Sequence, residues 1–431
     1  MWQKLDRRRF LQWTAGTSVV ACTAVSTAQQ ASSAADRLRV GVMGVNGRGR
    51  SLAQNFASRP GVEVAYLCDV DSRAIETAIA ALKEVLGTEA REPQGVADFR
   101  RVLDDPQVDA LVIAAPNHWH APATILACAA GKHVYVEKPC SHTAEEGELA
   151  LAAARKYNRV VATGTQRRSY GVIVEGMNKL REGVIGEIRY ARSWYRARRP
   201  GIGRGQVMDP PAWLDFDLWQ GPAPRRPYKD NLVHYNWHWH WHWGNGELGN
   251  NGVHALDLVR WGMGVDFPTR VTSSGGRYWH DDDQETPDTH VVTFEFGPRL
   301  ATWEGLSCSP TEPGITRAAI ATFHGDQGTL EVFDVGYRIY DMQRNLVADE
   351  SGPDGELEHI DSFLRCIREG GRPAADIEDG HRSTLLCHLG NISQRIGRAL
   401  QIDPGTGHIR DDAEAAALWG REYAPGWRPE V

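Results

Sequence analysis

The sequence predicts an α/β fold in two parts, a doubly wound parallel sheet followed by a second α/β region that is rich in strands. Across residues 38–164, short apolar runs that end in polar or glycine-rich clusters alternate with helical patterns, as in βαβ units. Between residues 290 and 333, apolar and polar residues alternate with the period of half-buried antiparallel strands. A chain of 431 residues also suits two domains better than one core.

The first predicted strand leads into a glycine-rich turn. An apolar run at residues 38–43 continues into Gly44-Val45-Asn46-Gly47-Arg48-Gly49 and then into an apolar helical pattern. This is the dinucleotide fingerprint of a Rossmann domain with one substitution, because Asn46 replaces the usual middle glycine. Gly44 would allow the tight turn, Gly49 the close packing of the helix, and Gly47 the close approach of the backbone to a pyrophosphate. We assign Asn46 and Arg48 to the same cofactor site.

The next strand ends in a carboxylate at the spacing expected for ribose recognition. Residues 62–68 are followed by Asp69, which lies 20 residues after Gly49. A carboxylate at this place accepts a hydrogen bond from a ribose 2′-hydroxyl. It favours NAD over NADP because it would repel a 2′-phosphate, although Arg50 and Arg73 keep NADP as an alternative.

Two further strands end in polar clusters. Residues 110–115 precede Pro116, Asn117 and His120, and the strand within residues 130–136 ends at Glu137-Lys138-Pro139. Open α/β sheets bind ligands outside the carboxyl ends of their strands, where burial lowers a lysine pKa and allows proton exchange with a bound hydroxyl. Lys138 is therefore the first catalytic candidate. The alternative is a surface lysine beside a structural proline.

Several separated motifs together resemble the Gfo/Idh/MocA oxidoreductase family, named for glucose-fructose oxidoreductase, inositol dehydrogenase and a rhizopine protein. The motifs are Pro116-Asn117 with His120, Ala130-Gly131-Lys132-His133-Val134, Glu137-Lys138-Pro139, Trp219-Gln220-Gly221-Pro222-Ala223-Pro224 and Gly249-Asn250-Asn251-Gly252-Val253-His254. The resemblance implies a Rossmann domain, an α/β domain with a large open, mostly antiparallel sheet, and an active site between them. It also implies cofactor contacts by Pro116, Asn117, His120, Glu137 and Lys138.

The same resemblance implies roles for three residues. Lys138 matches the family lysine beside nicotinamide and substrate. An aspartate that precedes a histidine by four residues in the family corresponds here to Asn250 and His254, which would share one helix face. Because an amide cannot accept a proton at neutral pH, acid/base work would fall to His254, Lys138 or both, while Asn250 orients a hydroxyl. His254 could instead cap a helix or lie in the core.

Two arginine clusters are substrate candidates. Arg167 and Arg168 follow a strand predicted at residues 159–164, and Arg192 lies in a long strand predicted at residues 186–199. Period two places Arg192 on one face with Tyr190 and Trp194, a surface suited to an acidic sugar. A sheet face within a dimer and surface ion pairs are the alternatives.

The segment 200–243 is rich in Pro, Gly and Trp, which indicates a functional loop or a partner contact. It ends in four tryptophans that alternate with three histidines, and an extended chain would place His238, His240 and His242 on one face. We assign His238 and His240 to a sugar pocket, with aromatic packing as the alternative. We predict no metal site, because alternate strand residues seldom converge on one ion.

The domain boundaries follow from these patterns. Residues 36–158 form the Rossmann domain and residues 159–431 the second domain. Helices predicted at residues 357–369 and 382–400 would pack back on the Rossmann domain.

The amino end predicts export. Asp6-Arg7-Arg8-Arg9-Phe10-Leu11 resembles the twin-arginine motif, and a short apolar stretch and small residues follow it. We expect residues 1–35 to be cleaved near Ala28 or Ala35 and the protein to reach the periplasm with no membrane span. Lipid attachment at Cys22 is less favoured. The six later cysteines have no Cys-x-x-Cys spacing, so we predict no disulfide framework.

The expected function is NAD(P)-dependent oxidation or reduction at a secondary alcohol of a sugar. A protein exported after folding would carry its dinucleotide with it, so we expect tight retention. The alternatives are a redox-neutral, NAD-dependent glycosidase and a sugar-binding protein without activity. The net charge of −7 argues against a nucleic-acid partner, and the family resemblance implies a homodimer or homotetramer.

Overall fold

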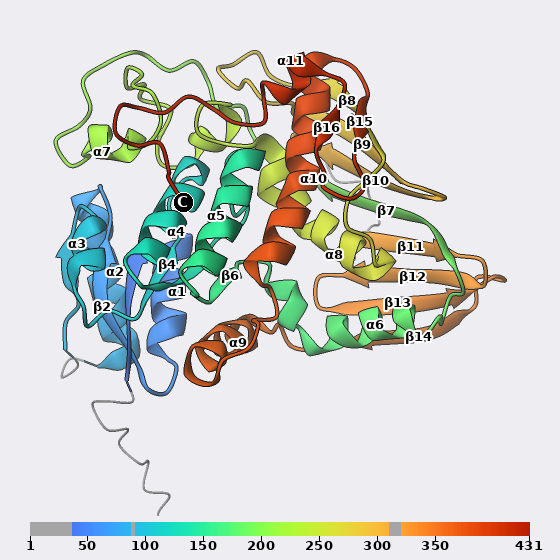
Figure 1. The fold of residues 1–431 in the computed structure, drawn as a ribbon, viewed down its shortest axis with the longest axis horizontal. Coiled ribbons are helices and arrows are strands. Elements are labelled where there is room, and N and C mark those ends of the chain that lie inside the picture. Colours follow the sequence, from blue (N-terminus) through green and yellow to red (C-terminus); the bar gives the residue numbers. More distant parts are fainter. Residues whose placement is uncertain (1–36, 88–90, 310–319) are drawn as a thin grey trace, which may run out of the picture. The chain divides into compact units, whose positions relative to one another are not determined.

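The computed structural model describes residues 37–87, 91–309 and 320–431, and residues 38–431 form one compact unit built on two sheets (Figure 1). The first sheet has six strands in the order β3-β2-β1-β4-β5-β6, and all its pairings are parallel. Its strands are β1 (Leu38–Met43), β2 (Val62–Cys68), β3 (Gln94–Val96), β4 (Ala110–Ile113), β5 (His133–Val136) and β6 (Val161–Thr163). The predicted Rossmann domain is confirmed.

Helices cover both faces of this sheet. They are α1 (Arg48–Ala57), α2 (Ser72–Leu86), α3 (Arg100–Asp104), α4 (Asn117–Ala129) and α5 (Ala144–Lys156). Leu52 and Phe56 of α1 pack with β1 in one apolar cluster, while α4 and α5 pack with β5 in another. The side chain of Thr143 caps α5 by accepting from the Glu146 N–H, and two glutamates in the first turn favour the helix dipole.

The second sheet has ten strands in the order β14-β13-β12-β11-β7-β10-β9-β8-β15-β16. Its pairings are antiparallel except that between β7 and β10, so the predicted mostly antiparallel sheet is confirmed. The strands are β7 (Ile188–Arg196), β8 (Arg270–Gly276), β9 (Thr289–Phe296), β10 (Arg299–Leu306), β11 (Ala321–Gly325), β12 (Gly328–Phe333), β13 (Gly336–Asp341), β14 (Leu346–Ser351), β15 (Leu400–Ile402) and β16 (Ile409–Arg410).

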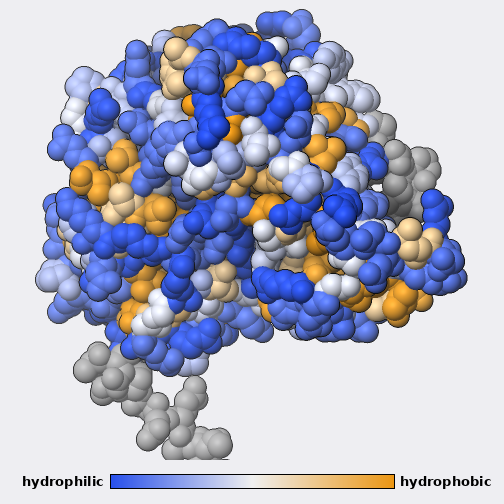
Figure 2. Space-filling view, turned by 45° about the vertical axis from the view of Figure 1, so that its right-hand side comes forward, coloured by the Kyte–Doolittle hydropathy of each residue, from blue (hydrophilic) through white to orange (hydrophobic). Residues whose placement is uncertain are grey.

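One face of the second sheet carries the second core. The helices α6 (Gly171–Arg181), α8 (Val253–Met263) and α10 (Ile377–Ile396) pack on it, and Trp303 and Phe323 are fully buried there. Alternate residues of the same strands point the other way, and Val291 and Leu300 are exposed on that side. Figure 2 shows apolar side chains as separate patches among hydrophilic ones on the face in view. Within the described residues, no helix is long and apolar enough to cross a membrane.

The parallel sheet extends past the boundary expected from the sequence. The first sheet includes β6, which ends at Thr163, whereas the sequence analysis ended the Rossmann domain at residue 158. The two closing helices contact this domain. Phe363 of α9 (Glu356–Glu369) packs edge-on against Phe56 and Tyr135, and α10 lies between the two sheets, in contact with α5, β6 and β8 (Figure 1).

The segment between β7 and α8 is largely irregular. It contains α7 (Phe216–Gln220), a 3-10 turn η3 (Asn236–Trp239) and a π-helical turn η4 (Leu248–Gly252). An extended conformation for the His–Trp repeat is therefore wrong, and His238, His240 and His242 do not share one strand face. The segment folds locally because its aromatic side chains pack into an apolar cluster of their own.

The six cysteines of the described residues are Cys68, Cys128, Cys140, Cys308, Cys366 and Cys387, and each is buried with a free thiol. The proposed signal peptide, including Cys22, lies outside the described residues.

Candidate active site

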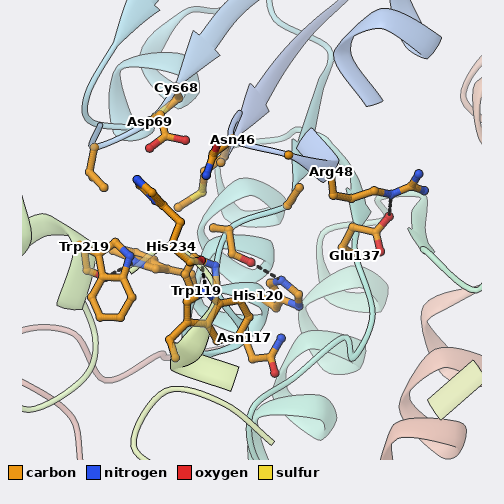
Figure 3. A pocket seen from close by; sticks show the side chains of 18 of the residues that line it. Asn46, Arg48, Cys68, Asp69, Asn117, Trp119, His120, Glu137, Trp219 and His234 are labelled. Carbon is orange, nitrogen blue, oxygen red and sulfur yellow. Dashed lines mark hydrogen bonds and ion pairs between the residues drawn. The ribbon is translucent and has the colours of Figure 1, made fainter. Parts of the chain in front are cut away.

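A cavity of about 560 Å³ lies at the carboxyl ends of β1, β2, β4 and β5 (Figure 3). It is lined from one side by residues that follow these strands and from the other by the segment between β7 and α8. The lining residues include Gly44, Asn46, Gly47, Arg48, Asp69, Val70, Pro116, Asn117, Trp119, His120, Glu137, Lys138, Gln166, Leu218, Trp219, His234, Tyr235, Trp237, His238 and Asn250.

The glycine-rich turn is shaped so that only glycine fits at two positions. Gly44 has a φ of +82°, in the left-handed region. A Cβ on Gly49 would lie 1.8 Å from the carbonyl oxygen of Gly44, so α1 approaches the turn more closely than any side chain allows. The resulting cradle opens into the cavity.

Asp69 connects this turn to the end of β2. One carboxylate oxygen accepts from the Val45 N–H at 2.7 Å, and the other accepts from the Asp71 N–H at 2.9 Å. Burial raises the pKa of Asp69 above its ordinary value, and the two N–H groups oppose that shift. The carboxylate therefore lies at the cavity edge where the sequence spacing placed it.

Arg48 is held by carboxylates on two sides. Its Nε lies 2.7 Å from Glu137 Oε1 (Figure 3), and its Nη2 lies 2.6 Å from Glu356 Oε1. Burial alone would raise the pKa of Glu137, but the charges of Arg48 and Lys138 hold that pKa below its ordinary value. The glycine-rich turn, the end of β5 and α9 are thus joined by one group of charges.

Two polar residues at the start of α4 differ in whether their side-chain atoms have hydrogen-bond partners. His120 directs Nδ1 to the Pro139 carbonyl at 2.6 Å and Nε2 to the Ala115 carbonyl at 2.7 Å, which braces the ends of β4 and β5 against each other. Asn117 is 3% exposed, and its Oδ1 has no partner within the described residues although the side chain lines the cavity. An unpaired buried acceptor of this kind is costly unless a ligand donates to it.

Lys138 and Asn250 meet in the cavity wall. Lys138 Nζ donates to the backbone oxygen of Asn250 at 2.7 Å and to its Oδ1 at 3.1 Å. An ammonium carries three donors, so one is left to face the cavity. Burial lowers the pKa of Lys138, while the carboxylates of Glu137 and Glu247 act in the opposite direction. A lysine in this environment can exchange a proton with a bound hydroxyl.

Lys138 and Asn250 line the cavity, whereas His254 does not. Asn250 belongs to η4, and its Nδ2 lies 3.4 Å from the Tyr235 hydroxyl. His254 lies one turn later in α8, is half-buried, and is not among the cavity-lining residues. Burial holds the pKa of His254 well below its ordinary value, and the nearby charges of Lys138 and Arg167 act in the same direction. The π-helical turn places only Asn250 directly on the cavity.

Comparison with known families identifies this arrangement. Residues 38–165 match the family model described as an oxidoreductase family, NAD-binding Rossmann fold. Residues 194–428 match the model of the same family's C-terminal alpha/beta domain. The chain belongs to the Gfo/Idh/MocA oxidoreductase family. The predicted family membership is confirmed.

The relatives of this chain include a dehydrogenase and a glycosyl hydrolase. Levoglucosan dehydrogenase of Pseudarthrobacter phenanthrenivorans is 26% identical over 402 residues, which cover 81% of this chain and 94% of that protein. A glycosyl hydrolase family 109 protein of Saccharopolyspora erythraea is 29% identical over 187 residues, which cover 39% of this chain and 41% of that protein.

Solved structures of the family share the fold. Levoglucosan dehydrogenase in complex with NADH has a TM-score of 0.67 at 19% identity, covering 85% of this chain and 99% of that one. The WlbA dehydrogenase from Bordetella pertussis, in complex with NADH and UDP-GlcNAcA, has a TM-score of 0.65 at 20% identity and the same coverage.

The structure separates the sequence-assigned substrate residues into two groups. His238 and Asn250 line the cavity, and His254 is not among the residues that line it. Arg167 pairs with Asp334 at 2.6 Å, and Arg168 is buried against Asp257 at 2.8 Å. Arg192 lies 3.6 Å from Glu304 on the face of the second sheet opposite α6, α8 and α10, here called the uncovered face. His240 lies 3.6 Å from Glu285. These four side chains have carboxylate partners and are not among the cavity-lining residues.

The ring of His238 has one defined tautomer. Its Nδ1 donates to the Tyr235 carbonyl at 2.6 Å, so the neutral ring presents Nε2 as an acceptor. Burial lowers the pKa of His238 to about 3, which keeps the ring neutral at pH 7. The described residues contain no cluster of three His, Cys, Asp or Glu side chains suited to a metal ion.

Several cavity residues carried no sequence signal of function. Tyr235 and His234 line the cavity but belong to no motif that we singled out for chemistry. Trp219 did lie in a family motif, but its role in the wall became visible only from the fold. The sequence feature that pointed to these wall residues was the aromatic-rich segment after β7.

Proposed function

We propose that this protein is an NAD(P)-dependent oxidoreductase that acts on a secondary alcohol of a sugar and holds its dinucleotide tightly. The observation that carries the proposal is the position of Lys138. Its ammonium is held by Asn250 at the wall of a cavity that also contains the glycine-rich turn and Asp69. A proton-exchanging group and a dinucleotide cradle therefore share one enclosed space.

The cavity residues fit a dinucleotide. The turn at Gly44 and Gly49 has no room for side chains, Asn117 offers an unpaired acceptor, and Asp69 stands where a ribose hydroxyl would be bound. When bound, the nicotinamide accepts a hydride from an alcohol carbon or returns it to a carbonyl. These residues would hold the cofactor beside Lys138.

We propose NAD as the preferred cofactor. Asp69 would repel a 2′-phosphate, and Arg73, one of the two arginines that could neutralise such a phosphate, is occupied. Arg73 donates to Asp71 at 2.9 Å and lies 3.5 Å from the ring centre of Trp213. NADP is the alternative, to be distinguished by comparing the affinities of the two nucleotides.

The substrate end of the cavity suits an uncharged sugar. Lys138 can exchange the hydroxyl proton, Asn250 can orient the reacting oxygen, and His238 Nε2 can accept from a second hydroxyl. The arginine and the lysine that line the cavity are Arg48 and Lys138. Arg48 is neutralised by Glu137 and Glu356, which leaves Lys138 as the cation that a substrate would meet. Tyr235 and Trp237 offer ring faces to the C–H groups of a sugar.

The relatives support a carbohydrate substrate. The names of levoglucosan dehydrogenase and of an aldose-aldose oxidoreductase from Caulobacter crescentus refer to sugars, and the WlbA dehydrogenase structure contains a nucleotide sugar.

Mass spectrometry of the nucleotide that co-purifies with the protein tests the cofactor proposal. Titration of the reduced, protein-bound nicotinamide against a panel of sugars and keto-sugars, followed by its absorbance, then tests the activity. We expect bound NAD(H) and reoxidation by at least one carbonyl compound. Failure of the protein to bind either NAD or NADP would refute the proposal.

A redox-neutral glycosidase is the second candidate, because glycosyl hydrolase family 109 proteins are among the relatives. Such an enzyme would oxidise the sugar transiently, so that a neighbouring C–H becomes acidic and elimination can occur. Incubation with aryl glycosides separates the two candidates. Release of the chromophore without net reduction of the cofactor would favour the glycosidase.

We also propose export by the twin-arginine route and function in the periplasm. The support is the Arg7-Arg8-Arg9 motif, and tight retention of the cofactor would follow from export of a folded holoenzyme. Replacing Arg8 and Arg9 by Lys should leave the precursor in the cytoplasm, as measured by cell fractionation. Periplasmic recovery of that variant would contradict the proposal.

We propose a homodimer or homotetramer, formed through the uncovered face of the second sheet. Val291 and Leu300 are 42% and 36% exposed on that face. Light scattering during size-exclusion chromatography should give a mass above that of one chain, and Val291→Lys with Leu300→Lys should lower it. A monomeric wild-type protein would refute the proposal.

A further inference from the structure

Residues 213–238, here called the covering segment, lie against the carboxyl-end edge of the first sheet. Leu218, Trp219, His234, Tyr235, Trp237 and His238 from this segment line the same cavity as Asp69 and the glycine-rich turn. In Figure 3, Asp69, His234 and Trp219 lie around the same opening. The segment belongs to neither sheet, yet it supplies one side of the cavity.

The covering segment has an apolar core of its own. Leu214, Phe216, Trp219, Tyr228, Leu232 and Trp237 are buried in a cluster separate from those of the two sheets. Phe216 and Trp219 stack with ring centres 5.5 Å apart. A segment packed in this way can keep its shape while its contacts with the first sheet form and break.

The first of its two attachments is at the end of β2. Asp71 and Leu214 form a β-bridge, the Ser72 N–H donates to the Trp213 carbonyl at 3.2 Å, and the Asp215 N–H donates to the Val70 carbonyl at 3.0 Å. The His234 Nε2 donates to Asp71 Oδ2 at 2.9 Å. Asp71 is buried, and its carboxylate also accepts three hydrogen bonds from Arg73, so His234 is the partner that joins it to the covering segment.

The second attachment is at the start of α4. His118 Nε2 and Trp119 Nε1 both donate to the Trp219 carbonyl oxygen, at 2.9 and 3.0 Å. Burial keeps the pKa of His118 well below its ordinary value, so the ring is neutral and the contact does not depend on a charge. One attachment lies at the end of β2 and the other at the start of α4, which follows β4, and the cavity lies between them.

We propose that the covering segment encloses the bound dinucleotide and that its release requires the attachment between His234 and Asp71 to open. His234 both lines the cavity and holds the segment to the end of β2, so loss of its hydrogen bond would speed exchange of the cofactor. This inference rests on the proposed function, because it presupposes a dinucleotide in the cavity. Retention of the dinucleotide then depends on His234 and Asp71 as well as on the glycine-rich turn.

The test measures exchange of bound nucleotide, which needs no substrate. The full-length holoenzyme, loaded with NAD⁺ if it is purified without it, is mixed with excess isotopically labelled NAD⁺, and the bound fraction is followed by mass spectrometry. We expect His234→Ala to exchange about tenfold faster than wild type, the effect of losing one hydrogen bond to a charged group. His234→Gln keeps a donor toward Asp71 and should restore slow exchange in part.

Lys229→Ala is the matched control. Lys229 belongs to the covering segment and also makes a 2.9 Å ion pair, but its partner is Asp283 of the second domain. This variant should exchange at the wild-type rate. Equal rates for His234→Ala and wild type, or equal acceleration by both alanine variants, would overturn the inference while leaving the cofactor proposal intact.

Hydrogen–deuterium exchange on the unmodified protein gives a second test that does not depend on the folding of a variant. NAD⁺ should protect the amides of residues 213–238 more than those of β12 and β13. Absence of that protection in a protein that binds NAD⁺ would overturn the inference. A protein that binds neither NAD⁺ nor NADP⁺ would instead refute the proposed function.

Discussion

At the scale of single residues, the proposed chemistry of the cavity depends on the contact between Lys138 and Asn250. The amide oxygen and the backbone oxygen of Asn250 orient the ammonium without adding a charge. An aspartate at the same place, as the family motif has it, would stabilise the charged lysine further. The asparagine therefore favours the neutral amine that alcohol oxidation needs.

Removing the amine should abolish turnover but not cofactor binding. Lys138→Met keeps a long apolar side chain and removes the proton-exchanging group, so kcat should fall by about 10²–10⁴-fold. Steady-state kinetics measure the loss, and calorimetric titration with NAD⁺ checks that binding is retained. Lys83→Met, on the surface of α2 in an ion pair with Glu92, serves as the control. Unchanged kcat in Lys138→Met would contradict the assignment.

Asn250→Asp should change the pH dependence. In the proposed reaction, oxidation of the alcohol requires neutral Lys138, so the rate should rise as the pH passes the lysine pKa, which burial places below the ordinary value. A carboxylate about 3 Å from Nζ would raise that pKa by about one unit or more and move the alkaline rise to higher pH. The pH profile of kcat/KM measures this. A shift to lower pH would argue against Lys138 as the base.

At the scale of elements, the glycine-rich turn and α1 form a junction that leaves no room for a side chain at Gly49. The first helix approaches the turn so closely that the missing Cβ of Gly49 is a requirement of packing. The adjoining end of β2 supplies Asp69, which holds the turn through the Val45 N–H. Helix, turn and strand end are therefore positioned as one unit.

Gly49→Ala should disturb this unit. Relief of the contact with the Gly44 carbonyl requires a shift of the turn, which should lower the free energy of unfolding by about 1–3 kcal/mol and weaken NAD⁺ binding. Denaturant unfolding and NAD⁺ titration measure the two effects. Gly171→Ala in α6 meets open space and should change stability by no more than about 1 kcal/mol. Equal behaviour of the two variants would show that the turn tolerates a side chain.

At the scale of the whole molecule, the two sheets are joined through α9, α10 and a set of buried histidines. Burial lowers the pKa of His388 to about 3 and that of His381 to about 4. Glu146, fully buried in α5, accepts from Arg421 and Tyr423 of the carboxyl-terminal segment. Neutral imidazoles and paired charges are thus built into the contacts between the two domains.

These histidines should make the fold sensitive to acid. Each stays neutral when folded but binds a proton when unfolded below its ordinary pKa of about 6.5, so stability is present above that pH and is lost as the pH falls toward the folded values. One such group contributes a slope of about 1.4 kcal/mol per pH unit in that window. Thermal unfolding between pH 7 and 4.5 should show this loss, and His388→Gln should make it shallower. An unchanged slope in that variant would exclude His388 as a contributor.

The sequence by itself determined the features that depend on neighbours along the chain. Glycines after a buried strand, a carboxylate at a fixed interval, and Lys138 at a strand end are local patterns, so the first sheet and its side of the cavity could be predicted. In the second sheet, period-two alternation predicted β7 and the strands between residues 290 and 333, but not β8, β13, β14, β15 or β16. The π-helical turn and the folded His–Trp repeat could not be predicted, because side-chain packing overrode their local pattern.

The tertiary structure decided which polar side chains face the cavity. Arg168 and Asp257 are 89 residues apart in sequence, and His234 and Asp71 are 163 residues apart, yet each pair forms one ion pair or hydrogen bond. Such contacts form only when distant segments meet, and nothing near either residue specifies its partner. Arg167, Arg168 and Arg192 therefore pair with carboxylates away from the cavity, and His234 lies at the cavity wall through its hydrogen bond to Asp71, because folding brings these distant partners together.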